Sequence, residues 1–473
     1  MYPLYLEFKR KFSMSMYKNM RILMGEMSFS KDFINDTCGN LYPVAEKSDD
    51  CIENVETNRY CVSRGSVKRL LCQFFPYATY EISCCNNEGN VGFCFHVGEA
   101  KATITLESDR LIYCCAEHRE EASASDFIKS KKSLIVSCRP GAFDVYFEIN
   151  GKAEFFHTFY EELFLESNTY SLFANGYVYL CASNNVTIDK VISYIDNGIS
   201  IADIRPIKYE TGEPILEQGR MFFTASVRMH EGAYQGVFSW LPGTAEFQLA
   251  GVLFYDCGDG KWRNYVAPVI LYNRDKKRWH VWVSSFEHKH ILAHGDFEGD
   301  PRFGVNVVDV VIMDKSTENS EVTDFVGFER DEDPDLIYDT ENSRWLMAIC
   351  RIDYRTGRYV YMFFESKEPF SNYRYIGRGK EGTETGGSFV KIDGEIFFVC
   401  GNDFKSRSEY RIYSKQGMRL AEFNYPDGGF RGWGTVIPIK IGSRIRYFWL
   451  TFDRHKGSDY TWSYGNLYCF EVN

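Results

Sequence analysis

The sequence predicts an all-β protein of two domains, an antiparallel β-sandwich followed by a five-bladed β-propeller. Aromatic residues, which favour strands, make up 16% of the chain. Short apolar runs alternate with turn residues without helical periodicity. The second half repeats at intervals of roughly 50 residues, which is typical of propeller blades. A length of 473 residues exceeds the ~250–300 residues beyond which one core usually splits. We therefore predict domains at residues 27–194 and 195–473.

Residues 1–26 precede the first domain and are rich in Met and in basic residues. Lys9, Arg10, Lys11 and Lys18 interrupt every apolar run, so the segment lacks the core of a secretion signal. We expect a disordered leader, with a natural start at Met27 as an alternative. No window approaches the ~20 apolar residues of a membrane span.

Charge and cysteine content narrow the function classes further. The formal net charge of −11 argues against nucleic acid and anionic lipid as partners, because both require a basic footprint. The 15 cysteines show neither zinc-site spacing nor a disulfide framework. They indicate reduced thiols in a cytoplasmic protein.

The first domain is predicted from short strands between residues 91 and 159. These runs include "VGFCFHVG", "ATITLES", "RLIYCCAE" and "SLIVSCRPG". Asn150-Gly151 lies between two further apolar runs and suits a type I′ hairpin turn. This pattern of strands separated by Pro-Gly and Asn-Gly resembles the concanavalin-like jelly rolls that accompany carbohydrate-active enzymes.

The second domain is predicted from five aromatic-rich segments of one shape. Most of them follow another strand after a short turn, as hairpins do. Their aligned aromatic residues stand 57, 66, 52 and 50 residues apart, and they are Phe222, Trp279, Trp345, Phe397 and Tyr447. Because one blade cannot bury both of its faces, stacked neighbours would supply the core.

Three carboxylates stand at the predicted starts of blades: Asp203, Asp333 and Glu384. The inner strands of a propeller begin at its central channel, so these side chains should converge there. Glycoside hydrolysis requires a carboxylate pair, one member protonated and the other ionised. Crowding of like charges raises the pKa of at least one of them. Asp335 is the alternate to Asp333, because it lies two residues further along the same strand.

The segments "EDPDLIYD" and "TETGGSFVKIDGEIFFVCG" resemble the five-bladed propeller glycoside hydrolases, especially the family 43 arabinanases and xylosidases. The invertase-like fructosidases are a related branch. The resemblance implies Asp203 as general base, Asp333 as the residue that tunes the acid, and Glu384 as general acid. This sequence departs from the pattern at "ADIRP", where Pro does not follow the Asp directly. "GWGT" also lacks the His that supports a central calcium ion, so we predict no cofactor and leave calcium open.

Further residues are candidates for sugar binding, and each also has a purely structural interpretation. Arg205 and Arg351 could bind hydroxyl groups or form salt bridges, as could Arg431. Aromatic rings could be sugar platforms or blade packing, at Trp240, Trp433, Trp462 and Tyr464. His288 and His290, with His294 nearby, could line the pocket or form structural hydrogen bonds. Two histidines at alternate positions could also bind zinc, but no third ligand appears, so we predict no metal.

The sequence thus predicts a hydrolase that removes terminal sugars from an oligosaccharide. A glycoside phosphorylase, a transglycosylase and a non-catalytic sugar-binding propeller are the alternatives. A phosphorylase would need a cationic phosphate site, for which Arg205, Arg351 and the histidines are candidates. The stereochemical course and the formation of a homo-oligomer are left open.

Overall fold

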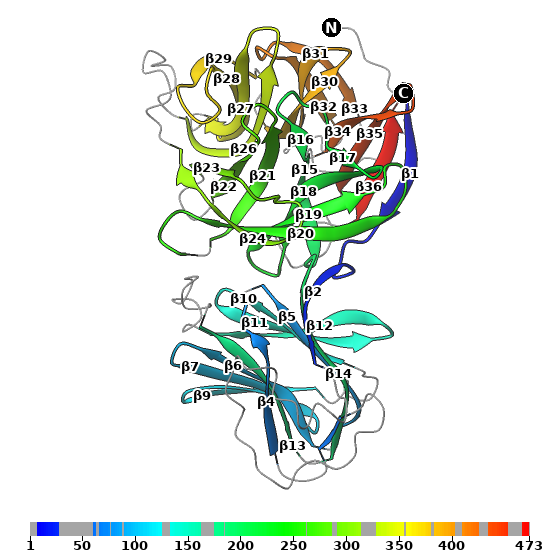
Figure 1. The fold of residues 1–473 in the computed structure, drawn as a ribbon, viewed down its shortest axis with the longest axis vertical. Helices are drawn as coiled ribbons and strands as arrows, with labels where there is room; N and C mark the ends of the chain where they lie inside the picture. The colour runs from blue at the N-terminus through cyan, green and yellow to red at the C-terminus, as the bar shows by residue number, and fades with distance from the viewer. Residues whose placement is uncertain are drawn as a thin grey trace. The chain divides into compact units, whose positions relative to one another are not determined.

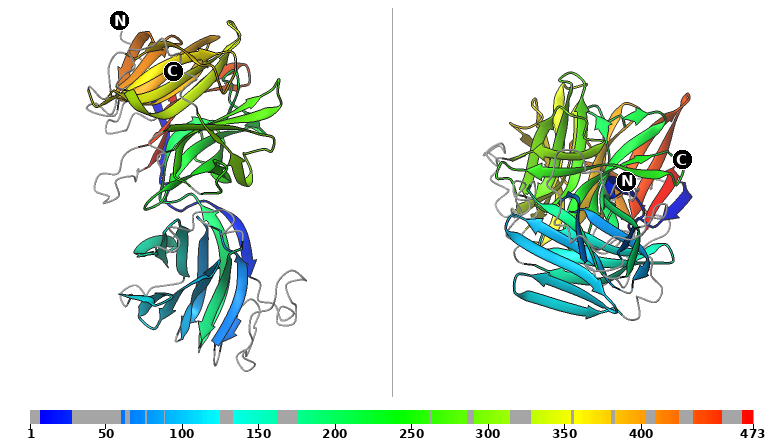
Figure 2. Two further views of the ribbon diagram at one scale, coloured as in Figure 1. Left: turned by 90° about the vertical axis from the view of Figure 1, so that its left-hand side faces the viewer. Right: turned by 60° about the horizontal axis from the view of Figure 1, so that its bottom comes forward.

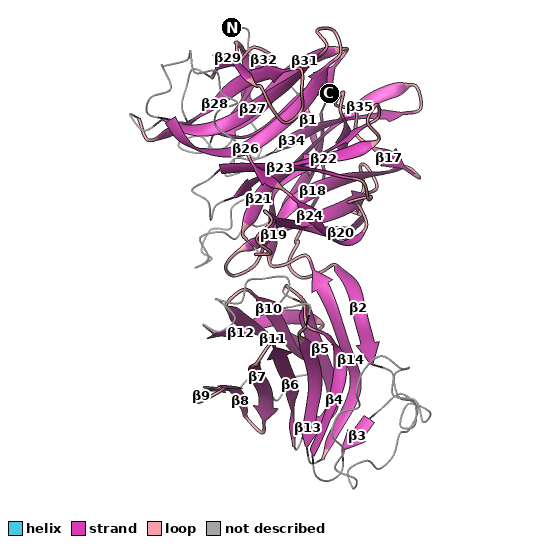
Figure 3. Ribbon diagram, turned by 60° about the vertical axis from the view of Figure 1, so that its left-hand side comes forward, coloured by secondary structure: helices cyan, strands magenta, loops and turns pink. Residues whose placement is uncertain are grey.

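The computed structural model describes residues 7–27, 60–62, 66–75, 77–87, 89–124, 133–161, 175–183, 185–261, 263–285, 291–313, 328–353, 356–379, 383–402, 409–424, 434–452 and 466–472. Every regular element in these ranges is a β-strand, as Figure 3 shows, so the all-β prediction is confirmed there. These residues contain no helix that is long and apolar enough to cross a membrane.

The chain divides into two compact units. Unit 1 comprises Met1–Met20, Asn197–Asp259 and Arg263–Asn473, and unit 2 comprises Arg21–Asp196 and Gly260–Trp262. The division after Asp196 lies beside the boundary expected at residue 194. Unit 2 is thus inserted near the beginning of unit 1.

The described residues of unit 2 form two sheets (Figure 1). The first consists, in spatial order, of β12 (Lys152–Tyr160), β11 (Ala142–Ile149), β10 (Ser133–Arg139), β5 (Thr79–Asn87), β14 (Val186–Asp196) and β2 (Arg21–Met27), with β3 (Tyr60–Val62) also paired to β14. The second consists of β4 (Ser66–Gln73), β13 (Tyr177–Ser183), β6 (Asn90–Val97), β7 (Ala100–Glu107), β8 (Arg110–Cys115) and β9 (His118–Ser123). Their pairings are antiparallel.

Aromatic side chains from both sheets form the core of unit 2. The ring of Phe95 on β6 lies 4.8 Å from that of Phe143 on β11, measured between centroids. Tyr113 on β8 stacks on Phe159 of β12 at 5.2 Å. All four side chains are fully or almost fully buried, and burial of such a ring contributes roughly 1.5–3 kcal/mol. The two sheets therefore pack through their facing side chains.

The hairpin turn predicted in unit 2 joins β11 to β12. Asn150 has a φ of 53° and Gly151 a φ of 77°. A type I′ turn requires positive φ at both central residues, and Asn-Gly adopts this conformation readily. The prediction of this turn is confirmed.

Unit 1 contains five sheets in the residues that the structure describes. The first has the order β15 (Ser200–Pro206), β18 (Arg220–Arg228), β19 (Ala233–Trp240), β20 (Phe247–Asp256) and β24 (Gly304–Asp309), with β17 (Leu216–Glu217) beside β18. The second has the order β16 (Lys208–Tyr209), β21 (Tyr265–Asn273), β22 (Arg278–Ser285), β23 (Ile291–Phe297) and β25 (Val311–Ile312).

The other three sheets of unit 1 have four strands each. The third consists of β26 (Phe328–Asp339), β27 (Arg344–Asp353), β28 (Arg358–Ser366) and β29 (Arg374–Arg378). The fourth consists of β30 (Glu384–Ile392), β31 (Glu395–Asn402), β32 (Glu409–Ser414) and β33 (Arg419–Asn424). The fifth consists of β34 (Thr435–Ile441), β35 (Arg444–Phe452), β36 (Leu467–Val472) and β1 (Phe8–Met14). In Figure 2 the colours of these three sheets run from yellow-green to red, except for blue β1.

The five sheets contact one another in a closed cycle. β15 contacts β21, β21 contacts β26, β26 contacts β30, β30 contacts β34, and β34 contacts β15. A separate apolar cluster fills each of the first four junctions between successive sheets. At the last junction the ring of Trp240 meets the edge of Phe448 at 5.5 Å. These five strands therefore surround one central region of unit 1, where their side chains can meet.

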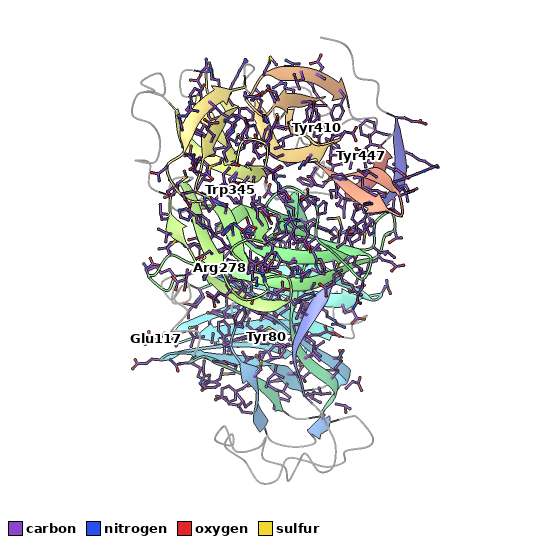
Figure 4. All side chains as sticks on the ribbon, turned by 45° about the horizontal axis from the view of Figure 1, so that its top comes forward. Tyr80, Glu117, Arg278, Trp345, Tyr410 and Tyr447 are labelled. Atoms are coloured by element: carbon purple, nitrogen blue, oxygen red, sulfur yellow. The ribbon has the colours of Figure 1, made fainter. Side chains whose placement is uncertain are left out.

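The five aligned aromatic residues have equivalent places in this cycle. Each lies on the strand that pairs with the central strand of its sheet, and these neighbouring strands are β18, β22, β27, β31 and β35. Figure 4 labels two of them, Trp345 on β27 and Tyr447 on β35. The repeat that the sequence displays therefore corresponds to one repeated strand position.

The expectation of a disordered leader at residues 1–26 is wrong for the part that the structure describes. Phe8–Met14 forms β1 and pairs with β36, completing the fifth sheet. Arg21–Met27 forms β2 in unit 2. The ring of Phe8 lies 5.8 Å from Phe423 and 6.3 Å from Trp449, between centroids. Lys9, Arg10 and Lys11 belong to this edge strand, where charged residues are usual.

Candidate active site

Four of the five central strands are interrupted at the same relative place. In each, two consecutive residues face one residue of the neighbouring strand, which is the geometry of a β-bulge. β26 has another such bulge nearer its start, at Arg330 and Asp331. In the four equivalent bulges the first residue has a left-handed backbone, with φ between 48° and 60°. These first residues are Asp203 on β15, Ala267 on β21, Asp333 on β26 and Gly386 on β30. Two of the predicted carboxylates thus occupy equivalent positions.

Asp203 is held by an arginine of its own sheet. Nη2 of Arg228 donates a hydrogen bond to Oδ2 of Asp203 over 3.2 Å. Both side chains are buried, with 5% of Asp203 and 3% of Arg228 exposed. A cation at this distance stabilises the ionised carboxylate.

Asp333 has neutral hydrogen-bond donors instead. Oδ2 accepts from Oγ1 of Thr385 over 3.0 Å and from the main-chain N–H of Gly386 over 3.1 Å. Its own N–H donates to Oγ of Ser284 on the second sheet, over 3.1 Å. Residues of three sheets therefore fix the position of this carboxyl group.

The pKa of Asp333 is raised to about 7. Burial is the largest cause, followed by the negative charges of Glu332 and Asp203, while Arg205 and the N–H of Gly386 act in the opposite direction. Hydrogen bonds also link the bulges of the first three sheets, because Oγ of Ser226 accepts from the N–H of Ala267 and Oγ of Ser284 accepts from that of Asp333. A carboxyl group that holds its proton near neutral pH suits the role of an acid.

Glu384 lies elsewhere. One carboxylate oxygen accepts from the main-chain N–H of Tyr361 over 3.0 Å. The other accepts from the Tyr413 hydroxyl group and lies 3.5 Å from Nη1 of Arg411. The side chain is fully buried, and burial raises its pKa. Its carboxylate therefore occupies the junction between the third and fourth sheets.

The alternation of side chains along β30 explains this placement. Successive residues of a strand point to opposite faces. Thr385 immediately precedes the bulge at Gly386 and reaches Asp333. Glu384 stands one residue earlier, so its side chain points the other way. The structure thus brings Asp203 and Asp333 toward one region, and Glu384 as the general acid stays a prediction.

Asp335, the alternate to Asp333, forms a buried ion pair. Nζ of Lys208 donates to its two oxygens over 3.0 and 2.9 Å. The main-chain N–H of Phe389 donates to the same carboxylate. Both charged side chains are at most 1% exposed. These contacts tie β16 of the second sheet to the third and fourth sheets, which is a structural role.

The two candidate arginines differ in their partners. Nε and Nη2 of Arg351 both donate to the carboxylate of Asp331, the latter over 3.0 Å. Arg205 is 1% exposed, and its Nη1 donates over 3.0 Å to the carbonyl of the preceding residue, Ile204. Within the described part of the chain, Nε and Nη2 of Arg205 have no hydrogen-bond partner.

Trp240 does not fit the role of a sugar platform. Its side chain is fully buried and stacks on Phe247, with centroids 5.7 Å apart and an interplanar angle of 5°. Its Nε1 donates to the carbonyl of Thr244 over 2.7 Å. Both ring faces are therefore enclosed in protein, and the packing interpretation describes this residue.

The predicted histidine and tryptophan sites are only partly described. The ring of His294 stacks on Phe370, with centroids 4.8 Å apart. Burial lowers the pKa of His294 to about 4, so this ring is neutral near pH 7 and has a packing role. The remaining candidates lie outside the described residues: His288, His290, Arg431, Trp433, Trp462 and Tyr464.

One cluster in the described residues has donor types that a metal ion accepts. Single ligand atoms of Glu332, Asp333 and Cys350 lie within 4.8 Å of one another. However, Sγ of Cys350 donates to the carbonyl of Glu384 over 3.1 Å. Burial raises the pKa of this thiol well above its usual value, and metal binding requires the thiolate. The cluster therefore fits a resident cation poorly.

Three residues that position Asp203 or Asp333 were not predicted from the sequence. Arg228 ends one of the repeated segments, whereas Ser284 and Thr385 are small polar residues next to bulges. Their positions in the sequence were a usable signal, because a polar residue next to the predicted start of a blade can reach the neighbouring sheet. The same contact recurs where Oγ of Ser226 accepts from the N–H of Ala267 over 2.9 Å.

No family model and no curated protein matches the sequence. Similar solved structures include glycoside hydrolases. One is a family 62 hydrolase in complex with xylotriose, 12% identical, with a TM-score of 0.38, covering 58% of this chain and 91% of that chain. The catalytic domain of the Coprinopsis cinerea family 62 α-L-arabinofuranosidase is 15% identical, with a TM-score of 0.38, covering 57% and 90%.

A third similar structure is an exo-β-1,3-galactanase from Phanerochaete chrysosporium with β-1,3-galactotriose. It is 10% identical, with a TM-score of 0.41, covering 56% of this chain and 60% of that chain. Similarities this weak carry no argument about activity. The function of this protein has to be inferred from its own residues.

Proposed function

We propose that this protein is a glycoside hydrolase in which the five sheets of unit 1 are the blades of a propeller and unit 2 is a β-sandwich. The closed cycle of contacts among β15, β21, β26, β30 and β34 supports the propeller. The repeated bulges support it as well, because a blade repeat should reproduce local backbone geometry. The substrate we propose is an oligosaccharide that loses a terminal sugar.

One observation carries the proposed chemistry: Asp203 and Asp333 have equivalent backbone positions but different partners. Asp203 forms a buried ion pair with Arg228. Asp333 retains its proton up to about pH 7, because it is buried among other carboxylates. In this mechanism Asp333 protonates the glycosidic oxygen as the leaving group departs. Asp203 then activates a water molecule or attacks the anomeric carbon, according to the separation of the carboxylates.

Glu384 is the competing candidate for the acid, on the basis of the sequence. Its oxygens are already bonded to Tyr361 and Tyr413. To protonate a substrate, Glu384 would have to leave these contacts at the junction of two sheets. Asp333 needs no such rearrangement, so we favour it.

The test is hydrolysis of a panel of aryl furanosides and pyranosides, together with unactivated oligosaccharides. The variants are Asp203→Asn, Asp333→Asn and Glu384→Gln, each checked for folding by thermal unfolding. We expect Asp203→Asn to lose activity on every substrate. Asp333→Asn should lose more on oligosaccharides than on aryl glycosides, because a good leaving group needs little protonation. The same selective loss in Glu384→Gln alone would assign the acid to Glu384.

A further inference from the structure

Arg205 is a buried cation at the candidate site, and one edge of its guanidinium group has no hydrogen-bond partner among the described residues. It lies two residues after Asp203, and 1% of it is exposed. Nε and Nη2, which form one edge of the guanidinium group, have no partner among the described residues. Arginine uses this edge for two parallel hydrogen bonds to a carboxylate or a phosphate.

Other buried arginines of this protein do use that edge. Nε and Nη2 of Arg351 both bond to Asp331. In unit 2, Nε and Nη2 of Arg139 bond to Asp144 over 2.9 and 3.3 Å. The fold therefore supplies a carboxylate where such an edge has a structural role. Neither Nε nor Nη2 of Arg205 has such a carboxylate among the described residues, and a buried cation without a bonded anion is costly.

The surroundings of Arg205 place its charge in the central region. Arg205 lies on β15, one of the five strands around this region. Burial raises the pKa of Asp333 and of the Tyr361 phenol, both on the third sheet, and the charge of Arg205 opposes this rise. The neighbouring carboxylates have other partners, since Asp203 bonds to Arg228 and Asp335 bonds to Lys208. A ligand that enters between the first and third sheets would thus meet an unpaired guanidinium edge beside the carboxylate pair.

We propose that Arg205 binds an oxyanion of the ligand through Nε and Nη2. This inference rests on the proposed function, because it places the oxyanion beside the reacting carboxylates. Two sources share this chemistry: the carboxylate of a uronic acid unit in the sugar, and inorganic phosphate as the attacking group. In the second case a phosphate oxygen bonds to the anomeric carbon, the glycosidic C–O bond breaks, and the leaving oxygen takes the proton of Asp333.

The experiment is equilibrium binding, by calorimetry, to inorganic phosphate, glucuronate and galacturonate, with glucose and galactose as neutral controls. Wild type is compared with Arg205→Gln and Arg205→Lys, which keeps the charge but loses the bidentate edge. We expect one class of oxyanion to bind to wild type. Binding should weaken about tenfold or more in Arg205→Gln, and several-fold in Arg205→Lys, because charge-assisted bidentate bonds are lost. Neutral sugars should show no dependence on Arg205.

The two sources give different patterns. Selective binding of phosphate identifies the attacking group, and selective binding of a uronate identifies the sugar. Absence of oxyanion binding, or binding that is equal in Arg205→Lys and wild type, would overturn the proposal. A large loss of stability in both variants would overturn it too, because it would show a structural role.

Binding requires no turnover, so the two proposals can fail separately. Oxyanion binding that depends on Arg205, in a protein that cleaves no glycoside, would remove the hydrolase and keep the oxyanion site. Cleavage of glycosides by a protein that binds none of the three oxyanions would keep the hydrolase and remove the oxyanion site.

Discussion

Asp203 and Asp333 adopt the same left-handed backbone, with φ values of 55° and 48°, yet only Asp203 is hydrogen-bonded to a cation among the residues described. In the mechanism we propose, this difference divides the roles of base and acid between them. Replacing Asp203 by Asn removes the charged group. Loss of one acid or base typically costs ~10²–10⁴-fold in rate, so we expect kcat to fall by about 10³-fold or more. Steady-state kinetics on an aryl glycoside would check this. Arg228→Lys, which keeps the cation, should retain more activity than Arg228→Met.

The pH profile should report the proton on Asp333. Because its pKa is raised to about 7, we expect kcat/KM to fall as pH rises above about 7, when the acid is lost. In Asp333→Asn this alkaline limb should disappear, together with most of the activity on oligosaccharides. If the limb persists in Asp333→Asn and disappears in Glu384→Gln, the acid is Glu384.

The same carboxyl group should affect stability. In the folded protein Asp333 releases its proton near pH 7, whereas an unfolded chain releases it near ~3.9. Between these values the folded state holds the extra proton, so its stability falls as pH rises from about 4 to about 7, by at most about 1.4 kcal/mol per pH unit. Urea unfolding at several pH values would measure this slope. Asp333→Asn should lack this contribution, and an unchanged slope would contradict the assignment.

The ion pair of Lys208 and Asp335 should be needed for folding rather than for chemistry. Lys208→Met leaves a buried, unpaired carboxylate, and breaking such a pair costs about 3–5 kcal/mol. Adding Asp335→Leu removes that charge and should recover part of the loss, although the N–H of Phe389 then lacks its acceptor. A double-mutant cycle by denaturant unfolding measures the coupling free energy between Lys208 and Asp335. If the two substitutions change the free energy of unfolding additively, the ion pair does not have this role.

β1 should stabilise unit 1 through Phe8. Its ring packs on Phe423, Trp449 and Phe470, and we expect Phe8→Ala to cost about 2–3 kcal/mol because the residue is partly buried. Lys9→Ala, at an exposed position of the same strand, is the control and should change stability by less than about 0.5 kcal/mol. A chain that begins at Met27 lacks β1 entirely and should be less stable than Phe8→Ala.

Much of the strand arrangement was predictable because it depends on local patterns. The Asn150-Gly151 turn and the hairpins around Trp279, Trp345 and Phe397 follow from turn residues and apolar alternation. β1 was missed because an edge strand needs few apolar residues and tolerates basic ones. Its pairing with β36 depends on residues near the other end of the chain, which no local pattern reveals.

The residue types of the candidate site were predictable from the sequence, but the directions of all its side chains were not. Asp203 and Asp333 stand at bulges, where the strand gains a residue and the alternation of side chains shifts. Whether Glu384 or Thr385 points toward Asp333 depends on the location of the bulge in β30, one residue after Thr385. A sequence pattern that locates Glu384 to within one residue therefore cannot assign its face.

The pairing of β1 with β36 has a consequence for protein synthesis. Phe8 is synthesised long before its partner Val472, because the two residues are far apart in the chain. Unit 2 lies between these strands in the chain, so it can fold while β1 has no partner. The fifth sheet can form only after translation has passed β36. Until then, nascent chains should expose the pairing edge of β1, and this interval is when we expect chaperones to be needed most.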